Sequence, residues 1–199
     1  ANEAPPSIIS VFLGETLNSI LTAVMNGQEL SSEKGLEIDG GARQLAMLSK
    51  DNTDRNRTSP FAFTGNKFEF RAVGSTQAIG YPLTVLNTAV SNIFKETNAM
   101  VEDLNKQGKS NTEVLLEVCR KWMAKSHQVI FNGDNYSSDW VEEAKKRGLP
   151  NLRTTAEALG VLRDEKAISF LCEMGVLTSD EIKMRHNAFI EKYNTCREI

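Results

Sequence analysis

Residues 53–71 read TDRNRTSPFAFTGNKFEFR, and this stretch decides how the rest of the chain is interpreted. Within it, two runs of alternating residues, 59–64 and 67–71, flank the pair Gly65 and Asn66. A glycine–asparagine pair between alternating runs is typical of a tight turn that joins two antiparallel strands. The stretch therefore predicts a β-hairpin.

The second strand of this predicted hairpin has two different faces. Successive side chains of a strand point to opposite sides, so Lys67, Glu69 and Arg71 share one face, whereas Phe68 and Phe70 share the other. We expect the phenylalanine face to pack on a core. A carboxylate between two cations suits a site for a divalent metal and anionic phosphates. The residues alone leave open an alternative, which is an exposed strand with paired surface charges.

The segment before the hairpin divides into a predicted helix and a long polar loop. Residues 8–25 carry apolar side chains at helical spacing, and Gly27 stands where such a helix would end. The expected apolar stripe consists of Ile9, Leu13, Leu17, Ile20, Leu21 and Val24. Residues 28–57 are polar and rich in Gly, Ser and Asp, so we expect a loop with a short strand near residues 36–38.

The segment after Pro82 is predicted to be nearly all helical. Apolar residues recur at helical spacing over residues 83–104 and again over residues 112–129. A final helix begins at Ser179 and runs close to Ile199. The strands and helices together indicate an α+β fold.

Two shorter helices are predicted from their capping residues. Ser138 or Asp139 caps a helix over residues 140–147, and Thr154 or Thr155 caps the next one. We therefore expect two regions in sequence order, with short antiparallel strands in residues 1–80 and a mainly helical region in residues 81–199.

The charge balance and the cysteine content exclude some classes of function. The chain has 199 residues and a net charge of -3, so it lacks the basic surface that nucleic-acid binding requires, and we expect no such partner. The short basic run 145–147 is typical of a solvated helix face. Three cysteines and two histidines occur without metal-ligand spacing, as is typical of a protein from a reducing compartment.

A membrane or secreted location is not expected either. The apolar segment 8–25 contains Glu15, Asn18 and Thr22, which disfavour a membrane span. No basic segment of the kind that begins a secretory signal precedes it. We therefore expect a cytoplasmic protein.

Three motifs then occur in a specific order: EAPP at residues 3–6, NRTSPF at residues 56–61 and KFEFR at residues 67–71. They resemble the ordered motifs of the glutamine synthetase superfamily, namely the flap Glu-Ala-Pro, the Asn-Arg segment and the strand pattern x-Glu-x-Arg. The type III branch is the most similar, because IFNG at residues 130–133 and RGLPNL at residues 147–152 also match its wording.

The resemblance implies an enzyme and a set of site residues. Such enzymes form glutamine from glutamate, ammonia and ATP through a γ-glutamyl phosphate. Glu3 aligns with the flap glutamate that helps bind and deprotonate ammonium, and Arg57 with the arginine that stabilises the transferred phosphoryl group. Lys67 takes the place of a basic residue near the nucleotide phosphates. Glu69 aligns with a ligand of magnesium or manganese, and Arg71 with an arginine that contacts the glutamate substrate.

The resemblance also implies a longer parent protein. Several metal-binding carboxylates, the histidine-bearing nucleotide segment and the N-terminal domain of the family have no counterpart among residues 1–199. We therefore expect a fragment of the catalytic domain that is inactive alone, taken from an enzyme that forms a homo-oligomer. A non-catalytic interaction or regulatory module that retains the fold is the alternative.

Overall fold

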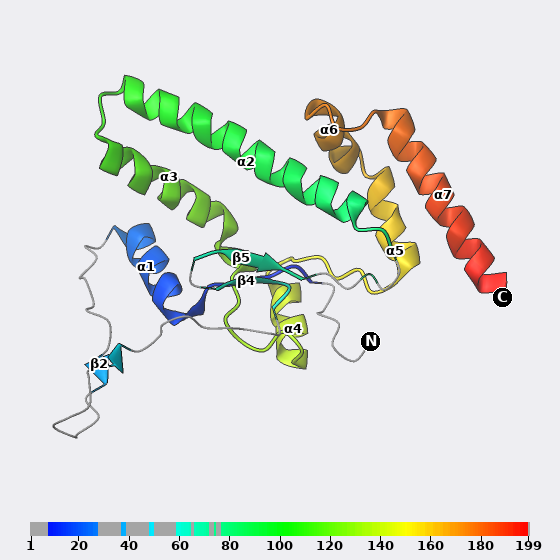
Figure 1. The fold of residues 1–199 in the computed structure, drawn as a ribbon, viewed down its shortest axis with the longest axis horizontal. Helices are drawn as coiled ribbons and strands as arrows, with labels where there is room; N and C mark the ends of the chain where they lie inside the picture. The colour runs from blue at the N-terminus through cyan, green and yellow to red at the C-terminus, as the bar shows by residue number, and fades with distance from the viewer. Residues whose placement is uncertain are drawn as a thin grey trace. The chain divides into compact units, whose positions relative to one another are not determined.

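The structure is a computed structural model that describes residues 8–27, 37–38, 48–49, 59–64, 66–71, 74 and 77–198. The chain forms two compact units, each of which combines segments that are distant in sequence (Figure 1). Unit 1 consists of residues 1–73 and 107–149, and unit 2 consists of residues 74–106 and 150–199.

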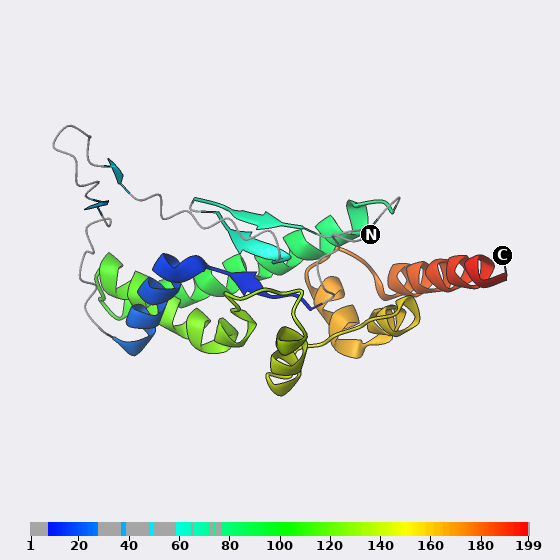
Figure 2. The same ribbon diagram turned by 90° about the horizontal axis from the view of Figure 1, so that it is seen from below.

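Unit 1 contains a three-stranded sheet with the order β1-β4-β5. Strands β4 (Phe61–Phe63) and β5 (Phe68–Phe70) are antiparallel, and Ala62 lies opposite Glu69. They appear as neighbouring arrows in both views (Figures 1 and 2). The predicted β-hairpin is therefore confirmed. Strand β1 (Val11–Phe12) pairs with β4 in parallel and was not predicted.

The expected helix over residues 8–25 is wrong at its beginning. The chain is extended through β1, and helix α1 spans Gly14–Asn26. Burial alternates along the extended part, since Ile8 and Phe12 are buried while Ile9 is 56% exposed. An apolar run of this length suits a strand or a helix, and the choice depends on partners that lie far away in sequence. The expected stripe is wrong too, because it included Ile9 and Ile20, which is 39% exposed.

A second, two-stranded sheet lies in the segment that we predicted to be mostly loop. Strand β2 (Glu37–Ile38) is antiparallel to β3 (Leu48–Ser49). The short strand expected near residues 36–38 is thus confirmed, whereas β3 was not predicted. The remaining residues between 28 and 57 lie outside the described residues.

Three further helical segments complete the described part of unit 1. They are α3 (Asn111–Ser126), the 3-10 helix η1 (His127–Val129) and α4 (Ser138–Lys146). Helix α1 packs against α3 (Figures 1 and 2). The cap of α4 is Ser137, whose side chain accepts a hydrogen bond from the backbone of Trp140, and not Ser138 or Asp139.

The core of unit 1 is built around Trp140. This side chain is fully buried together with Ile8 and Ala144. The ring of Phe131 stacks on it with a centroid separation of 4.1 Å, and Leu149 packs against the same cluster. Residues from both sequence segments of unit 1 therefore share one apolar cluster, which holds the segments together.

All regular secondary structure in the described residues of unit 2 is helical. It contains α2 (Gly80–Lys106), α5 (Thr155–Leu159), the 3-10 helix η2 (Gly160–Arg163), α6 (Glu165–Glu173) and α7 (Ser179–Glu198). The expected α+β fold class is confirmed by the sheet and these helices, although α6 was not predicted. In the described ranges, no helix combines the length and apolar character that crossing a membrane requires.

Local side-chain caps define several helix ends in unit 2. Thr154 caps α5 and forms a reciprocal capping box with Glu157, as one of the two predicted alternatives. Asp164 accepts hydrogen bonds from the first backbone N–H groups of α6. These caps satisfy donors that have no partner within the helix itself.

Candidate functional site

The charged face of β5 has the predicted geometry. A guanidinium nitrogen of Arg71, Nη2, donates to Glu69 Oε2 at 2.9 Å, and Lys67 Nζ lies 3.9 Å from Glu69 Oε1. The three side chains are therefore on the same side of the strand, which confirms the predicted register. Glu69 is 37% exposed, so its carboxylate remains accessible from solvent.

The aromatic face of the hairpin differs from what we expected. The ring of Phe68 lies 5.5 Å from that of Phe61 and 5.2 Å from that of Phe63, measured between centroids. Phe70 contacts Phe61 at 5.8 Å. However, Phe68 is 47% exposed, so the rings pack mainly on one another and not on a core as predicted. The hairpin is stabilised by its own cross-strand aromatic pairs.

The charged face is instead the one that continues into the interior. Phe12, Ala62 and Glu69 are consecutive cross-strand partners on β1, β4 and β5, and such partners lie on one face. Phe12 is 3% exposed and Ala62 is 1% exposed. Glu69 is thus a carboxylate at the outer end of a row whose other members are packed, and this packing fixes the backbone that carries it.

The described parts of two motif segments lie side by side in the sheet. Because β5 is antiparallel to β4, the end of β5 lies beside the beginning of β4, and the backbone N–H of Arg71 donates to Pro60 O at 2.8 Å. The beginning of β1 lies at the same end of the sheet, because β1 and β4 are parallel. Glu3 and Arg57 themselves lie outside the described residues.

The described residues fit a divalent metal only as one contributor to a site. They contain no group of three His, Cys, Asp or Glu side chains that could hold an ion together. Magnesium takes about six oxygen ligands in octahedral geometry. Glu69 can supply at most its own two oxygens, so the other ligands have to come from outside the described part of this chain.

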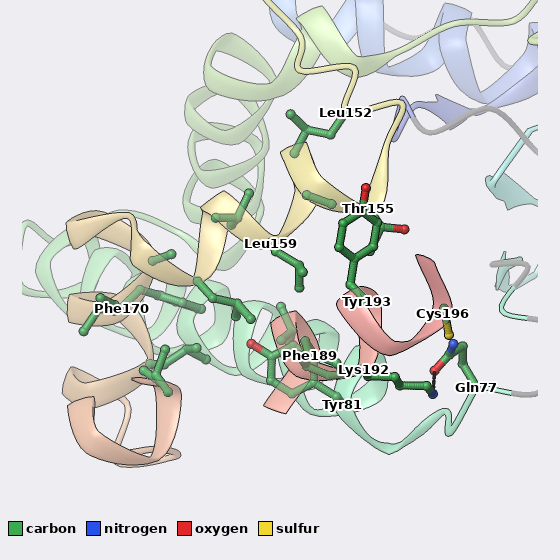
Figure 3. Close-up of a pocket in the computed structure, with 18 residues that line it drawn as sticks. Gln77, Tyr81, Leu152, Thr155, Leu159, Phe170, Phe189, Lys192, Tyr193 and Cys196 are labelled. Atoms are coloured by element: carbon green, nitrogen blue, oxygen red, sulfur yellow. Dashed lines mark hydrogen bonds between the residues drawn. The ribbon is translucent and has the colours of Figure 1, made fainter. Parts of the chain in front are cut away.

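Unit 2 contains a separate cavity of about 700 Å³ (Figure 3). Its walls are largely apolar and include Leu159, Phe170 and Phe189. At its edge, Lys192 Nζ donates to Gln77 Oε1 at 3.2 Å, the contact that Figure 3 draws as a dashed line. None of the predicted site residues that the structure describes lines this cavity. Its lining suits apolar groups and is unsuited to phosphates.

Two polar residues that stabilise unit 1 through long-range hydrogen bonds were not predicted from the sequence. Asn132 and Asn135 lie in a turn-rich stretch whose composition indicates a loop and nothing more. In the structure, both side chains make hydrogen bonds to residues more than 100 positions away. No local pattern could have identified these contacts, because their partners are adjacent only after folding.

Comparison with known proteins agrees with the motifs. Residues 114–199 match the family model of the glutamine synthetase C-terminal domain. Over nearly its whole length the chain is similar to glutamine synthetases, in agreement with the resemblance of its motifs. Within that class the resemblance extends to the type-3 branch: the chain is 42% identical over 196 residues to the type-3 glutamine synthetase of Dictyostelium discoideum.

Two further relatives match the chain over nearly the same length. The chain is 35% identical over 196 residues to a glutamine synthetase of Bacteroides fragilis and 37% identical over 194 residues to one of Butyrivibrio fibrisolvens. The three alignments cover 97–98% of this chain but only 26–27% of each relative. The chain therefore spans about a quarter of the length of the curated relatives that it matches.

Proposed function

We propose that this chain forms part of a glutamate–ammonia ligase, which makes glutamine from glutamate, ammonia and ATP through a γ-glutamyl phosphate. The observation that carries the proposal is the end of the sheet where Arg71 lies beside Pro60, so that the described parts of the KFEFR and NRTSPF motifs are neighbours. Strand β1, which follows the EAPP motif in sequence, pairs in parallel with β4, and a shared site requires such neighbouring segments.

The charges of β5 suit the proposed reaction. Phosphoryl transfer needs cations close to the oxygens on which negative charge develops. Lys67 is proposed to lie near the nucleotide phosphates, and Arg71 to contact the glutamate substrate and the phosphorylated intermediate. In the present geometry Glu69 holds both cations on its own side of the strand.

The proposed metal is magnesium or manganese, with Glu69 as one of its ligands. When bound, such an ion would neutralise phosphate charge during transfer. The chain's own contribution is to fix the Glu69 carboxylate at the end of a packed cross-strand row. Glu3 is proposed to help bind and deprotonate ammonium, and Arg57 to stabilise the transferred phosphoryl group.

The proposal concerns the complete protein, whose remaining parts supply the missing ligands. Residues 1–80 are proposed to belong to the catalytic sheet, and residues 81–199 to form a mainly helical region. We further propose a cytoplasmic homo-oligomer. The 199-residue chain alone is expected to give no glutamine synthesis above background, because one carboxylate cannot hold the ions that the reaction needs.

The test compares variants of the complete protein in a hydroxamate-forming assay with ATP, glutamate and magnesium. Glu69→Gln keeps the shape of the side chain but removes its charge, so the magnesium concentration for half-maximal rate is expected to rise at least roughly 10-fold. Arg71→Ala is expected to raise the KM for glutamate and to leave the magnesium requirement unchanged. Glu142→Gln, an exposed acid on α4, is the control.

The outcomes separate the proposal from its alternative. Absence of any glutamine synthesis by the complete protein would favour a non-catalytic interaction or regulatory module. Normal activity and normal magnesium dependence of Glu69→Gln would refute the role of Glu69 while leaving the family relationship intact.

A further inference from the structure

The segment of residues 8–14 is held on both of its sides. On one side, Val11 and Phe12 pair in parallel with Phe61 and Ala62 of β4. On the other side, the backbone N–H of Phe131 donates to Val11 O at 3.0 Å, next to a parallel bridge between Val11 and Ile130. The short strand β1 is therefore sandwiched between the hairpin that carries Glu69 and the stretch that follows η1.

Two asparagine side chains add specific contacts to this arrangement. Asn135 Oδ1 accepts a hydrogen bond from Ser10 Oγ at 2.8 Å, and the two residues are 1% and 0% exposed. Asn132 Oδ1 accepts from the backbone N–H groups of Leu13 at 3.0 Å and Gly14 at 3.2 Å. Each contact spans more than 115 positions of sequence.

Asn132 performs a task that α1 cannot perform for itself. The first N–H groups of a helix have no partner within the helix and need an acceptor. The capping residue of α1 is Leu13, which has no side-chain acceptor, and no side-chain cap bond forms at that position. Asn132 supplies the missing oxygen from outside the helix, so the junction between β1 and α1 is fixed in position and in register.

The opposite end of the segment is anchored by apolar packing. Ile8 is 1% exposed and belongs to the cluster of Trp140 and Ala144. The residues that precede Ile8 in sequence are those of the predicted flap motif, with Glu3 five positions before it. A motif that has to meet a substrate at a defined place needs a fixed base from which it extends.

We infer that Asn132 and Asn135 are positioning residues, which fix the base of the segment carrying Glu3 against the strands that carry Glu69 and Arg71. This inference rests on the proposed function. Neither asparagine is placed in contact with substrate; each acts through the backbone and side chains of residues 10–14. Loss of either contact should therefore affect the ammonium-dependent step more than the binding of ATP.

The experiment uses the complete protein and a matched pair of substitutions at one position. Asn132→Ala removes the acceptor, and we expect the KM for ammonium to rise by roughly 10-fold, the scale of one ordinary hydrogen bond, with the KM for ATP unchanged. Asn132→Asp keeps an acceptor oxygen, and its negative charge is favourable at a helix N-terminus. We expect Asn132→Asp to restore the KM for ammonium to within about twofold.

Arg120→Ala provides the control for general damage to α1. Arg120 Nε donates to Val24 O at 2.8 Å and thus holds the opposite, C-terminal end of the same helix. We expect this variant to lose stability to a degree similar to Asn132→Ala but to keep a normal KM for ammonium. If both variants raise this KM equally, the role of Asn132 is merely structural and the inference is wrong.

Ser10→Ala serves as the second variant in case Asn132→Ala does not fold. It removes one buried hydrogen bond with little change of volume, and the same selective rise in the KM for ammonium is expected. An unchanged KM in this variant would contradict the inference.

Amide hydrogen exchange distinguishes failure of the inference from failure of the proposed function. Exchange at Leu13 and Gly14 should accelerate in Asn132→Ala and not in Asn132→Asp, whether or not the protein makes glutamine. If the wild-type protein has no activity but exchange follows this pattern, only the proposed function fails. If the wild-type protein is active and neither exchange nor the KM changes, only the inference fails.

Discussion

The contacts within unit 1 differ in kind from the contacts within unit 2. In unit 1, Asn132, Asn135 and Arg120 connect residues that are between 96 and 125 positions apart. In unit 2, the helix caps that the structure describes connect neighbours, as where Thr154 and Glu157 satisfy each other's backbone. Apolar contacts among α5, α6 and α7 also stabilise unit 2, and one exposed hydrogen bond, from Lys192 to Gln77, spans 115 positions of sequence.

This difference determines which element ends can be read from sequence. A capping residue followed three positions later by Glu is a local signal, so the beginning of α5 was predictable. The beginning of α1 is set by the side chain of Asn132, which lies 119 positions away in sequence, and no local signal marks it. The contrast also predicts that damage within one unit stays within that unit.

The largest effect is expected for Trp140→Ala. Truncating a fully buried tryptophan should destabilise unit 1 by roughly 3–5 kcal/mol, because a cavity replaces the ring against which Phe131 and Ile8 now pack. Hydrogen exchange resolved by peptide should show faster exchange in β1 and α4, with α5 to α7 unchanged. Trp122→Ala, at a partly buried position of α3, should cost less. Equal acceleration in both units would show that they unfold together and would remove the contrast.

Two glycine substitutions form the next pair. A Cβ on Gly133 would lie 2.6 Å from Cζ of Phe131, a ring that is stacked on Trp140 and has little freedom to move. Gly133→Ala should therefore cost roughly 1–3 kcal/mol. A Cβ on Gly160 in unit 2 meets nothing within 4 Å, so Gly160→Ala should be neutral or slightly stabilising. Chemical denaturation of both variants checks this, and a similar loss in both would refute the steric argument.

A cap in unit 2 provides a smaller effect. Thr154→Ala removes the side-chain oxygen that accepts from the backbone N–H of Glu157, and we expect a loss of about 1 kcal/mol confined to α5. Thr155→Ala, one position later, is the control and should change stability by only a few tenths of a kcal/mol. Local hydrogen exchange in α5 reports both. Disturbance of unit 1 by Thr154→Ala would contradict the view that this cap acts locally.

The smallest effect concerns the acid titration of Glu181. Hydrogen bonds from the backbone N–H and the hydroxyl of Thr178 lower the pKa of this carboxyl below its ordinary value of 4.5. Because the pKa is lower in the folded chain, ionised Glu181 stabilises the fold above the unfolded pKa, and this contribution is lost as the pH falls through the folded pKa.

An NMR titration of the Glu181 carboxyl in Thr178→Ala checks this effect. The variant loses the hydroxyl but keeps the backbone donor, so the pKa should move part of the way back towards 4.5. Thr155→Ala should leave the titration of Glu181 unchanged. No movement in Thr178→Ala would mean that the hydroxyl does not stabilise the carboxylate.

The residues of β5 show which features of the fold could be predicted from the sequence and which could not. The alternation of Lys67, Phe68, Glu69, Phe70 and Arg71 predicted the two faces of β5, because strand geometry alone fixes which side chains share a side. It did not predict which face would be buried, since that depends on the packing around Ala62 and Phe12.

The basic run at the end of α4 is a second example. Its composition indicates a solvated face, yet Arg147 connects α4 to the preceding segment. Its Nη1 donates to Ile130 O at 2.8 Å, and its Nε donates to Glu143 Oε1 at 2.6 Å. Its guanidinium also lies 5.4 Å from the ring centroid of Trp140. A long side chain can make such contacts in any direction, and only the fold decides which carbonyl it meets.

The sequence by itself determined the features of this protein that depend on neighbours along the chain. These are the β4–β5 hairpin, the alternation of charge along β5, the long helices and the motifs of the glutamine synthetases. Only the tertiary structure decided that residues 8–12 are extended, that β1 runs parallel to β4, and that Asn132 and Asn135 hold this segment. The physical reason is that a strand needs a partner for its backbone groups and a helix end needs an acceptor, and here both come from parts of the chain that folding alone brings together.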